Sequence, residues 1–433
     1  MKSTLAAGAL LVAAVLGLAR TTAAETLQDA WRLAIERDQV LAAATAEVEA
    51  ARANESAARA ARWPTVQANA AYTRFDQAPA LEISGPSLTL RSPPIFAGDD
   101  FVMASGEIRL PLYTGGQISA GIEAASNSTI GAAENERTAL ASLKLETARA
   151  YVSVLRTRRT LKTSESRVQS LVAHVNDVGH MVERGLVPMS DLLAARVALA
   201  NAEQERVRAA NAVKVSEAGY NRWIGLPLDR VPDLDEQVAA DASLAHEPLE
   251  GLLRQALESR SELKGLNAHA EALASQSRAE FGKLLPQFAL SGGYSYFENE
   301  ILDRQNVSAV AIGFKWNVFD AGQTRNRAAA LRSTSRATER RVDDLRSLIE
   351  LQVRTAYLDA GEAQARLTAM REAVAQADEN LRTSRELYGV GLGTNTQVLD
   401  AVTLQLSAVN NRNDALLDES LALLHLAYAV GTL

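Results

Sequence analysis

The sequence of 433 residues contains no cysteine, which limits how the protein can be stabilised and anchored. It has no disulfide framework, and a signal segment without a cysteine at its cleavage site cannot be lipidated there. The chain has a net charge of −7 and no basic block of the nucleic-acid-binding type, so we expect no nucleic-acid partner. Beyond the first residues, no run of about 18 apolar residues predicts a transmembrane helix. Any membrane attachment must therefore come from the folded protein.

Catalytic signatures are also missing. The five histidines show no HExxH spacing, and the sequence has neither a GxSxG motif nor a cysteine nucleophile. His174 and His180 are too far apart in the helical repeat to share one helix face. We therefore predict a protein that is not an enzyme, with no cofactor and no metal site of its own.

The first residues predict export. Lys2 precedes an apolar run from Leu5 to Ala19, and the small residues 21–24 suit cleavage by signal peptidase near Glu25. The alternative is an N-terminal membrane anchor, but the run is shorter than the ~20 residues that a spanning helix needs. We interpret residues 1–24 as a signal peptide.

Comparing the sequence with itself reveals two similar halves. At one constant offset, Leu27 matches Leu249, Ala34 matches Ala256, Pro64 matches Pro286 and Tyr72 matches Tyr294. From Leu110 onward a second, smaller offset applies, so that Tyr113 matches Phe319, Gly116 matches Gly322, Tyr151 matches Tyr357, Gly185 matches Gly391 and Leu193 matches Leu399. The difference between the two offsets indicates an insertion in the first half, between Phe75 and Leu110.

These matches predict four segments: a signal peptide at 1–24, a first structural repeat at 25–225, a linker at 226–248 and a second repeat at 249–433. Each repeat should contain a helix, a β-hairpin, a very long helix, a tip turn near residue 185 or 391, and a last helix. The first hairpin has a long loop at 76–100, rich in Pro, Gly, Ser and Asp, and the second has a short loop at 298–306.

The long helices show a heptad pattern. No proline interrupts residues 117–183, and apolar or small residues recur there at alternating spacings of three and four. The same phase continues in the second half at positions 349, 353, 356, 360, 363, 367, 370, 374, 377, 381 and 388. Each helix would be roughly 100 Å long, with left-handed supercoiled packing. A long dimeric coiled coil is the simple alternative, but strand-like segments argue against it.

Four segments have the pattern of β-strands, and three of them alternate in polarity. The clearest alternation places Val310, Ile312 and Phe314 against Ala309 and Ala311. Their length suits tilted outer-membrane strands, although a buried soluble hairpin would look similar. Four strands cannot close a transmembrane barrel, so strands that span a membrane would require the chain to oligomerise. Three copies would supply twelve strands.

Local motifs in both halves resemble those of the TolC family of outer-membrane channels. Pro64 and Pro286 end a helix before a strand, and "ERGLV" and "GVGLGT" occupy the helical turns. The strand-to-helix junctions read "LYTGGQ" and "VFDAGQTR", and they contain Gly115, Gly116, Asp320 and Gly322. The resemblance covers nearly the whole chain from Glu25 to Leu433.

The resemblance implies an α+β membrane protein with an internal duplication. It would be a homotrimer with a 12-stranded β-barrel, four strands per protomer, in the outer membrane of a Gram-negative bacterium, continuous with a coiled-coil α-helical barrel in the periplasm. Such a channel is the exit duct of a tripartite efflux pump or type I secretion system. Its partners would be outer-membrane lipid, a periplasmic adaptor (membrane fusion) protein and an inner-membrane transporter of ABC, RND or MFS type. The alternative is an elongated periplasmic coiled-coil structural or adaptor protein without a pore.

In the family, a VGL-like stretch at each tip engages the adaptor. The resemblance assigns this role to two tips, formed by Gly185, Leu186 and Val187 in the first half and Val390, Gly391 and Leu392 in the second. Glycines that only turn the chain would be an alternative, but a tight turn does not require an exposed leucine.

The family's gate is formed by two aspartates three residues apart. Asp400 matches the second aspartate, but Gln397 occupies the first position, where the other half of the chain offers Asp191. Rings of such carboxylates would favour cations and bind divalent metals. Tyr388 matches a latching tyrosine, although Gly393 replaces the arginine partner of some members, so that the latch is altered or absent. The alternatives are that each aspartate is an ordinary first-turn acid favoured by the helix dipole, and that the tyrosine only packs.

Overall fold

The computed structural model describes residues 24–77, 80–85, 88–94, 99–238, 241–299 and 303–433. The predicted signal peptide, 1–24, lies outside these residues apart from Ala24. The first part of the chain forms α1 (Leu27–Arg37), α2 (Gln39–Ala60), β1 (Thr65–Arg74), β2 (Ala80–Gly85), β3 (Leu88–Pro94), β4 (Asp100–Tyr113), α3 (Gln117–Glu183) and α4 (Met189–Trp223). The second part forms η1 (Ala242–His246), α5 (Leu249–Ser259), α6 (Ser261–Gly282), β5 (Gln287–Phe297), β6 (Asn306–Lys315), α7 (Gln323–Gly389) and α8 (Asn395–Val430).

The chain divides into two compact units. One unit combines the described residues up to Ala43 with Arg137–Arg260 and Ser347–Leu433, and it is entirely helical apart from its connections. The other combines Ala44–Glu136 with Ser261–Arg346 and contains β1 to β6, every strand among the described residues. No helix in the described part of the chain is both long and apolar enough to cross a bilayer.

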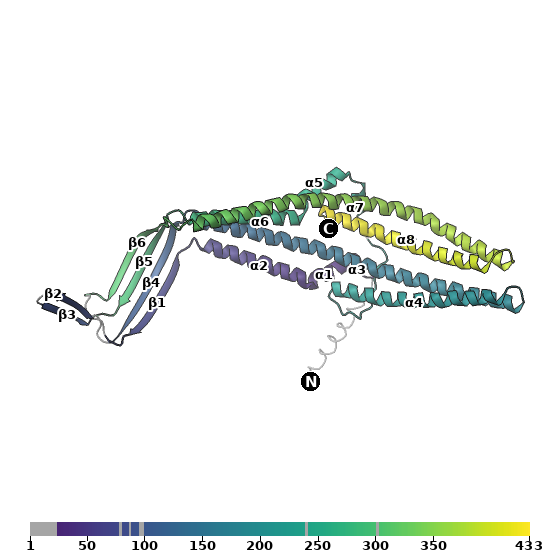
Figure 1. The fold of residues 1–433 in the computed structure, drawn as a ribbon, viewed down its shortest axis with the longest axis horizontal. Coiled ribbons are helices and arrows are strands. Elements are labelled where there is room, and N and C mark those ends of the chain that lie inside the picture. The colour runs from purple at the N-terminus through teal and green to yellow at the C-terminus, as the bar shows by residue number, and fades with distance from the viewer. Residues whose placement is uncertain (1–23, 78–79, 86–87, 95–98, 239–240, 300–302) are drawn as a thin grey trace, which may run out of the picture. The chain divides into compact units, whose positions relative to one another are not determined.

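Four strands form one antiparallel sheet in the order β1-β4-β5-β6 (Figure 1). The register aligns Val66, Ile108, Gly292 and Val310 across the sheet. Because directly opposed residues share a face, one face carries large apolar side chains: Val66, Ile108, Leu110, Leu290, Val310, Ile312 and Phe314. Over the same part of the sheet the other face carries small or polar residues: Thr65, Gln67, Glu107, Arg109, Ser291, Ala309, Ala311 and Lys315. Toward the end of the sheet away from the helices, this face also carries Met103, Phe297 and Val307.

The interval 76–100, which we expected to be a loop, also contains regular structure. β2 and β3 pair there as a separate two-stranded antiparallel sheet. These two strands are difficult to predict from the sequence, because each is only six or seven residues long and the interval is rich in turn-forming residues.

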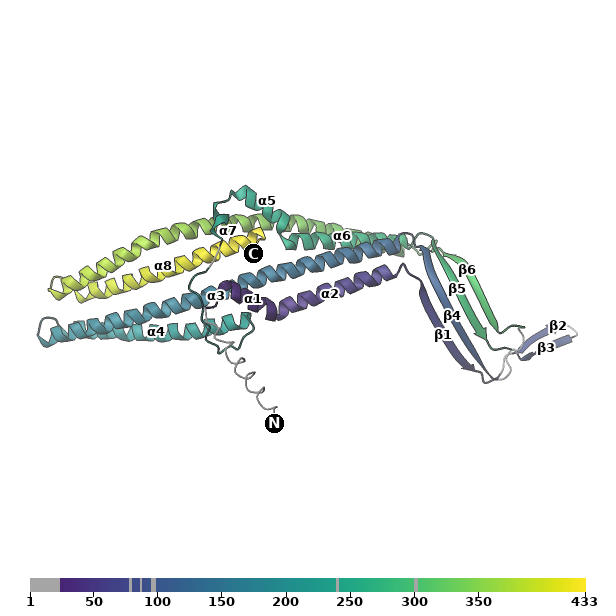
Figure 2. The same cartoon turned by 180° about the vertical axis from the view of Figure 1, so that it is seen from behind.

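The two longest helices, α3 and α7, contain 67 residues each. Each ends in a short turn, after which α4 or α8 runs back along it (Figure 2). Of the eleven heptad positions predicted for the second half, nine are buried, and the two exceptions are half-buried Met370 and Val374. The predicted heptad phase is therefore the packing face of α7.

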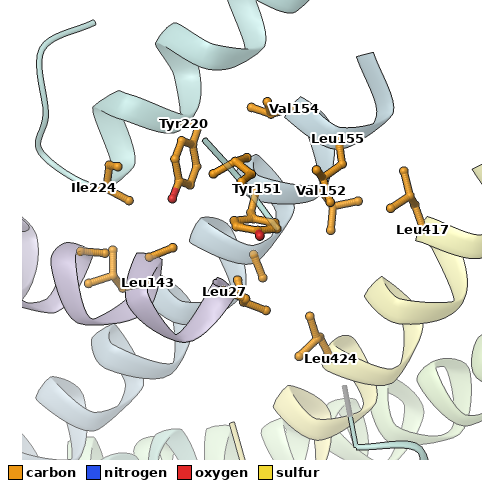
Figure 3. Close-up of a cluster of buried hydrophobic side chains, with 14 of the residues drawn as sticks. Leu27, Leu143, Tyr151, Val152, Val154, Leu155, Tyr220, Ile224, Leu417 and Leu424 are labelled. Atoms are coloured by element: carbon orange, nitrogen blue, oxygen red, sulfur yellow. The ribbon is translucent and has the colours of Figure 1, made fainter. Parts of the chain in front are cut away.

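The main hydrophobic core of the helical unit brings the two parts of the chain together (Figure 3). Tyr151 on α3 and Tyr220 on α4 are fully buried, with ring centroids 5.9 Å apart in an edge-to-face arrangement. Leu27 of α1 and Leu417 and Leu424 of α8 complete this contact. Burial is the main cause that raises the pKa of both tyrosines, so both hydroxyls remain protonated donors at neutral pH.

Candidate functional site at the helical tips

The two predicted tip turns have the same backbone geometry. After α3, the N–H of Gly185 donates to the carbonyl of Val182 at 2.9 Å, and the N–H of Leu186 donates to that of Met181 at 2.9 Å. This pair of bonds is the Schellman motif, which requires a left-handed residue after the helix. Gly185 supplies it with a φ of +69°.

The turn after α7 repeats this motif. Gly391 has a φ of +77° and donates to the carbonyl of Tyr388 at 3.0 Å, while Leu392 donates to that of Leu387 at 2.8 Å. The glycines therefore turn the chain, and this structural role does not account for the apolar residues that surround them.

Those apolar residues differ in exposure. The side chains of Leu186, Val390 and Leu392 are 66%, 71% and 79% exposed. Val187, in contrast, is half-buried and packs against the neighbouring hydrophobic cluster. Leu186, Val390 and Leu392 are thus the most exposed large apolar residues of the two turns.

A small core, which we call the tip cluster, joins the two tips. It consists of the buried residues Val178, Leu192, Tyr388 and Val398, one from each of α3, α4, α7 and α8. A pocket of about 450 Å³ lies beside it, lined by both turns and by Asp191. Two tip motifs from opposite halves of the sequence therefore form one site.

Four polar residues form a hydrogen-bonded chain next to the tip cluster, which we call the tip network. The hydroxyl of Tyr388 donates to Oδ2 of Asp191 at 3.1 Å. Nδ2 of Asn395 donates to the carbonyl of Asp191 at 3.1 Å, and Oδ1 of Asn395 lies 2.7 Å from Nε2 of the buried His174. The rings of His174 and Tyr388 are 5.8 Å apart. The network thus connects all four helices.

The start of each return helix explains why Asp191 and Gln397 behave differently. Both occupy the third position of a helix. Gln397 forms a capping box, because its side chain accepts from the N–H of Thr394 while Thr394 accepts from the N–H of Gln397. In α4 the N-cap is Pro188, which has no N–H to donate, so the carboxylate of Asp191 is available to Tyr388.

The environment of Tyr388 maintains its role as a donor. Burial, and then the hydrogen bond to Asp191, raise its pKa from 10.0 to about 12. Because the folded-state pKa is raised, the associated stability is fully present below pH 10 and is lost as the pH rises toward 12. The Tyr388–Asp191 contact is therefore insensitive to pH over the physiological range.

Asp400 is not part of this network. It is exposed on α8, and its carboxylate forms no hydrogen bond or ion pair with other residues that the structure describes. The structure thus brings Asp191 and Tyr388 together and leaves Asp400 as a free carboxylate one turn beyond Gln397.

Two residues of the tip network, His174 and Asn395, are not among the predicted site residues. The capping-box pattern "TNTQ" at 394–397 marks the start of α8 and would have located Asn395 at its first position. His174 is next to the heptad position 175, and nothing in the sequence indicates that it reaches a residue 221 positions away.

The predicted strand-to-helix junctions contain specialised backbone. Gly115 and Gly116 have positive φ, and a Cβ on Gly115 would lie 2.4 Å from the carbonyl oxygen of Gly282, so no larger residue fits there. Asp320 accepts hydrogen bonds from the N–H groups of Gly322 and Thr324; the side chain of Thr324, and then its N–H, contribute most to lowering the pKa of the Asp320 carboxyl. These residues orient and cap the long helices.

The tip site combines exposed apolar side chains with carboxylates. Among the described residues, no group of three or more His, Cys, Asp or Glu side chains could hold a metal ion within one chain. The site instead offers an exposed apolar surface and carboxylates.

Comparisons with known proteins agree with this architecture. Residues 30–225 and 252–432 match the family described as outer membrane efflux protein. The chain is 24% identical to the outer membrane protein TolC of Vibrio cholerae serotype O1 over 98% of its length and 95% of that protein.

Solved structures show the same fold. The outer membrane protein VceC from Vibrio cholerae is similar with a TM-score of 0.79 at 18% identity, covering 94% of this chain and 96% of that one. CusC, which forms a transmembrane channel, is similar with a TM-score of 0.80 at 16% identity, covering 94% and 92%. The predicted resemblance to TolC-type proteins is confirmed, and the comparisons favour it over the alternative of a periplasmic protein without a pore. Because the family match includes both tips and the four-stranded sheet, the chain belongs to the outer membrane efflux protein family.

Proposed function

We propose that three copies of this chain form an outer-membrane channel, the exit duct of a tripartite efflux pump or type I secretion system. The observation that carries this proposal is the four-stranded sheet with its two free edges. Its strands alternate in direction, so β1 and β6 run antiparallel to each other, and β6 of one copy can pair with β1 of the next. Three sheets joined in this way would close a 12-stranded barrel, which removes every edge.

The two faces of the sheet support the same assembly. Val66, Val310 and Ile312, on the apolar face, are 73%, 81% and 73% exposed in the single chain. Outer-membrane barrels direct such a face toward lipid and the polar face toward the lumen. The helices also expose apolar residues, including Val197 on α4 and Leu351 and Leu358 on α7, each at least 60% exposed. Such residues suit contact with neighbouring copies.

The proposed channel also gives each segment of the chain a place. We propose a signal peptide at 1–24, repeats at 25–225 and 249–433 and a linker at 226–248. The equal lengths of α3 and α7, whose bounds are related by the same offset at both ends, support an internal duplication. In this arrangement the helices extend into the periplasm, where an adaptor docks on the tips and connects the duct to an inner-membrane transporter.

Divalent cations are expected to block the channel at a carboxylate gate. In planar lipid bilayers, wild-type protein should form cation-selective channels, and Asp400→Ala should weaken block by Ca²⁺ roughly tenfold or more, because two unit charges ~4 Å apart near a protein surface attract each other by about 4 kcal/mol and a loss of about 1.4 kcal/mol is already tenfold. Asp191→Ala should weaken block less, since its carboxylate is engaged by Tyr388. Asp359→Ala, an exposed acid in the middle of α7, is the control. Absence of channels would contradict the proposed function, and block unchanged in both tip variants would contradict the gate.

The Tyr388–Asp191 bond is expected to hold the tip closed. Tyr388→Phe retains the packing of the ring but removes a hydrogen bond to a carboxylate worth about 1.5–3 kcal/mol. If that bond exists only in the closed tip, the closed-to-open equilibrium of each protomer shifts toward open by about tenfold or more. Single-channel recordings without adaptor would show a higher open probability. Tyr357→Phe, on the same helix, should behave as wild type, and equal open probability in both variants would exclude Tyr388 from the gate.

A further inference from the structure

A groove between α3 and α8, away from the tips, has a composition that neither the duct nor its gate requires. It has a volume of about 480 Å³ and lies within the helical unit, between helices that can be followed in Figure 1. Its lining comes from one face of each helix and from the connection after α4: Arg159, Lys162, Thr163, Ser166, Arg167, Glu236, Gln405, Leu406, Val409, Arg412, Asn413 and Leu416.

The charges in this lining are unbalanced. Four cationic side chains, Arg159, Lys162, Arg167 and Arg412, face the groove, and the only carboxylate of the lining is Glu236. That carboxylate is 78% exposed and lies 3.8 Å from the guanidinium of Arg159, a loose contact. Concentrating like charges between two low-dielectric helices creates a positive potential that attracts an anion.

Two of the arginines have unused donors. The side chains of Arg159 and Arg167 are only 16% and 15% exposed. Nη1 of Arg159 and Nε of Arg167 are buried and have no hydrogen-bond partner among the described residues. Arg167 does pair with Glu205 of α4 through Nη1, so Glu205 neutralises part of its charge but leaves Nε free. Buried guanidinium N–H groups are normally paired, so these two donors are left without their usual acceptor.

The other polar groups of the groove do not fill this need. The hydroxyls of Thr163 and Ser166 donate to carbonyls of their own helix, and the amide of Gln405 donates to Asp378. Lys162 and Arg412 are exposed, and neither has an ion-pair partner in the part of the chain that the structure describes. An entering ligand would therefore meet two free cations, Lys162 and Arg412, beside the partly exposed side chains of Arg159 and Arg167.

We propose that this groove binds a small polyvalent anion with phosphate or carboxylate groups. Arg159 and Arg167 would donate from α3, and Arg412 would donate from α8. Guanidinium groups suit this chemistry because their planar fork pairs with two oxygens of one oxyanion. The bound anion would link α3 to α8. It would thereby hold the pair formed by α3 and α4 against the pair formed by α7 and α8. This inference does not depend on the proposed duct function.

The test uses the purified full-length protein in detergent with sodium pyrophosphate and sodium citrate as probes, at constant ionic strength. Calorimetry should detect binding of at least one probe, and comparing the two distinguishes a phosphate from a carboxylate preference. The double variant Lys162→Gln/Arg412→Gln removes only exposed, unpaired charges and should weaken binding about tenfold. The matched control Arg208→Gln/Arg371→Gln removes two exposed cations elsewhere on α4 and α7 and should bind as wild type.

Arg159→Lys tests the role of the unused donor, because it keeps the charge and removes the planar fork; it should also weaken binding several-fold. The proposal is overturned if neither probe binds more tightly than chloride, or if the groove variants and the control variant lose affinity equally. Circular dichroism of each variant establishes that the helices are retained, so weaker binding reports on the groove.

Discussion

Replacing Val310 by arginine is expected to reduce assembled trimer in the outer membrane to a small fraction of the wild-type amount. Val310 is 81% exposed on the apolar face of β6, the strand that would pair with a neighbouring copy. An arginine facing lipid near the bilayer centre costs about 2–4 kcal/mol, so three copies would cost about 6–12 kcal/mol per trimer. Unheated gel electrophoresis of outer-membrane fractions measures the trimer directly.

The adjacent residue provides the control. Ala309 lies on the opposite face of β6, aligned with Gly293 and with Glu107 of β4. Ala309→Arg therefore introduces the same charge one residue away, on the face expected to line an aqueous lumen, and should leave assembly close to wild type. If both variants assemble equally well, the apolar face does not contact lipid, and the barrel proposal fails.

The helices and the sheet could be predicted from the sequence because their signals are local and repeated. The absence of proline between residues 117 and 183 and the strict heptad phase predict one helix, and α3 has these bounds. The alternation in Val310, Ile312 and Phe314 predicts a strand with one apolar face, and the register of β6 with β5 places these residues on such a face. Periodicity fixes which side of an element is apolar; in α7 that side is buried, whereas in β6 it is exposed in the single chain.

The arrangement of the tip could be predicted only in part. The sequence identifies the glycines of both turns, since the left-handed position after a helix strongly favours glycine. It does not identify the partners of Asp191, because the bond to Tyr388 joins residues 197 positions apart. The family pattern presents Gln397 as a gap in the gate, whereas its capping role depends on the local pattern with Thr394. At position 397 the family motif therefore suggests a missing gate residue, whereas the hydrogen bonds of the capping box explain why glutamine is found there.

The exposed leucines at the tips are expected to be required for export of the substrate through the assembled pump, but not for trimer formation or for conductance of the channel. Leu186 and Leu392 follow the left-handed glycines and remain 66% and 79% exposed, so neither is needed to fill the tip cluster. In the proposed trimer they give six apolar contacts to the adaptor. Burying a leucine side chain at such a contact is worth about 2 kcal/mol, which is about 30-fold in affinity for each contact.

The double variant Leu186→Asp/Leu392→Asp should therefore lose export almost completely, to the level of a strain that lacks the protein. Its trimer and its conductance in bilayers should remain near wild type, because the Schellman bonds of both turns are made by the backbone. Leu186→Met/Leu392→Met retains the apolar surface and should export normally. Loss of export in both double variants, or normal export with aspartate at both tips, would show that the adaptor does not dock on these leucines. Since each single substitution removes three of the six contacts, it should produce a measurable defect, and Leu392→Asp should be the more severe because Leu392 is the more exposed.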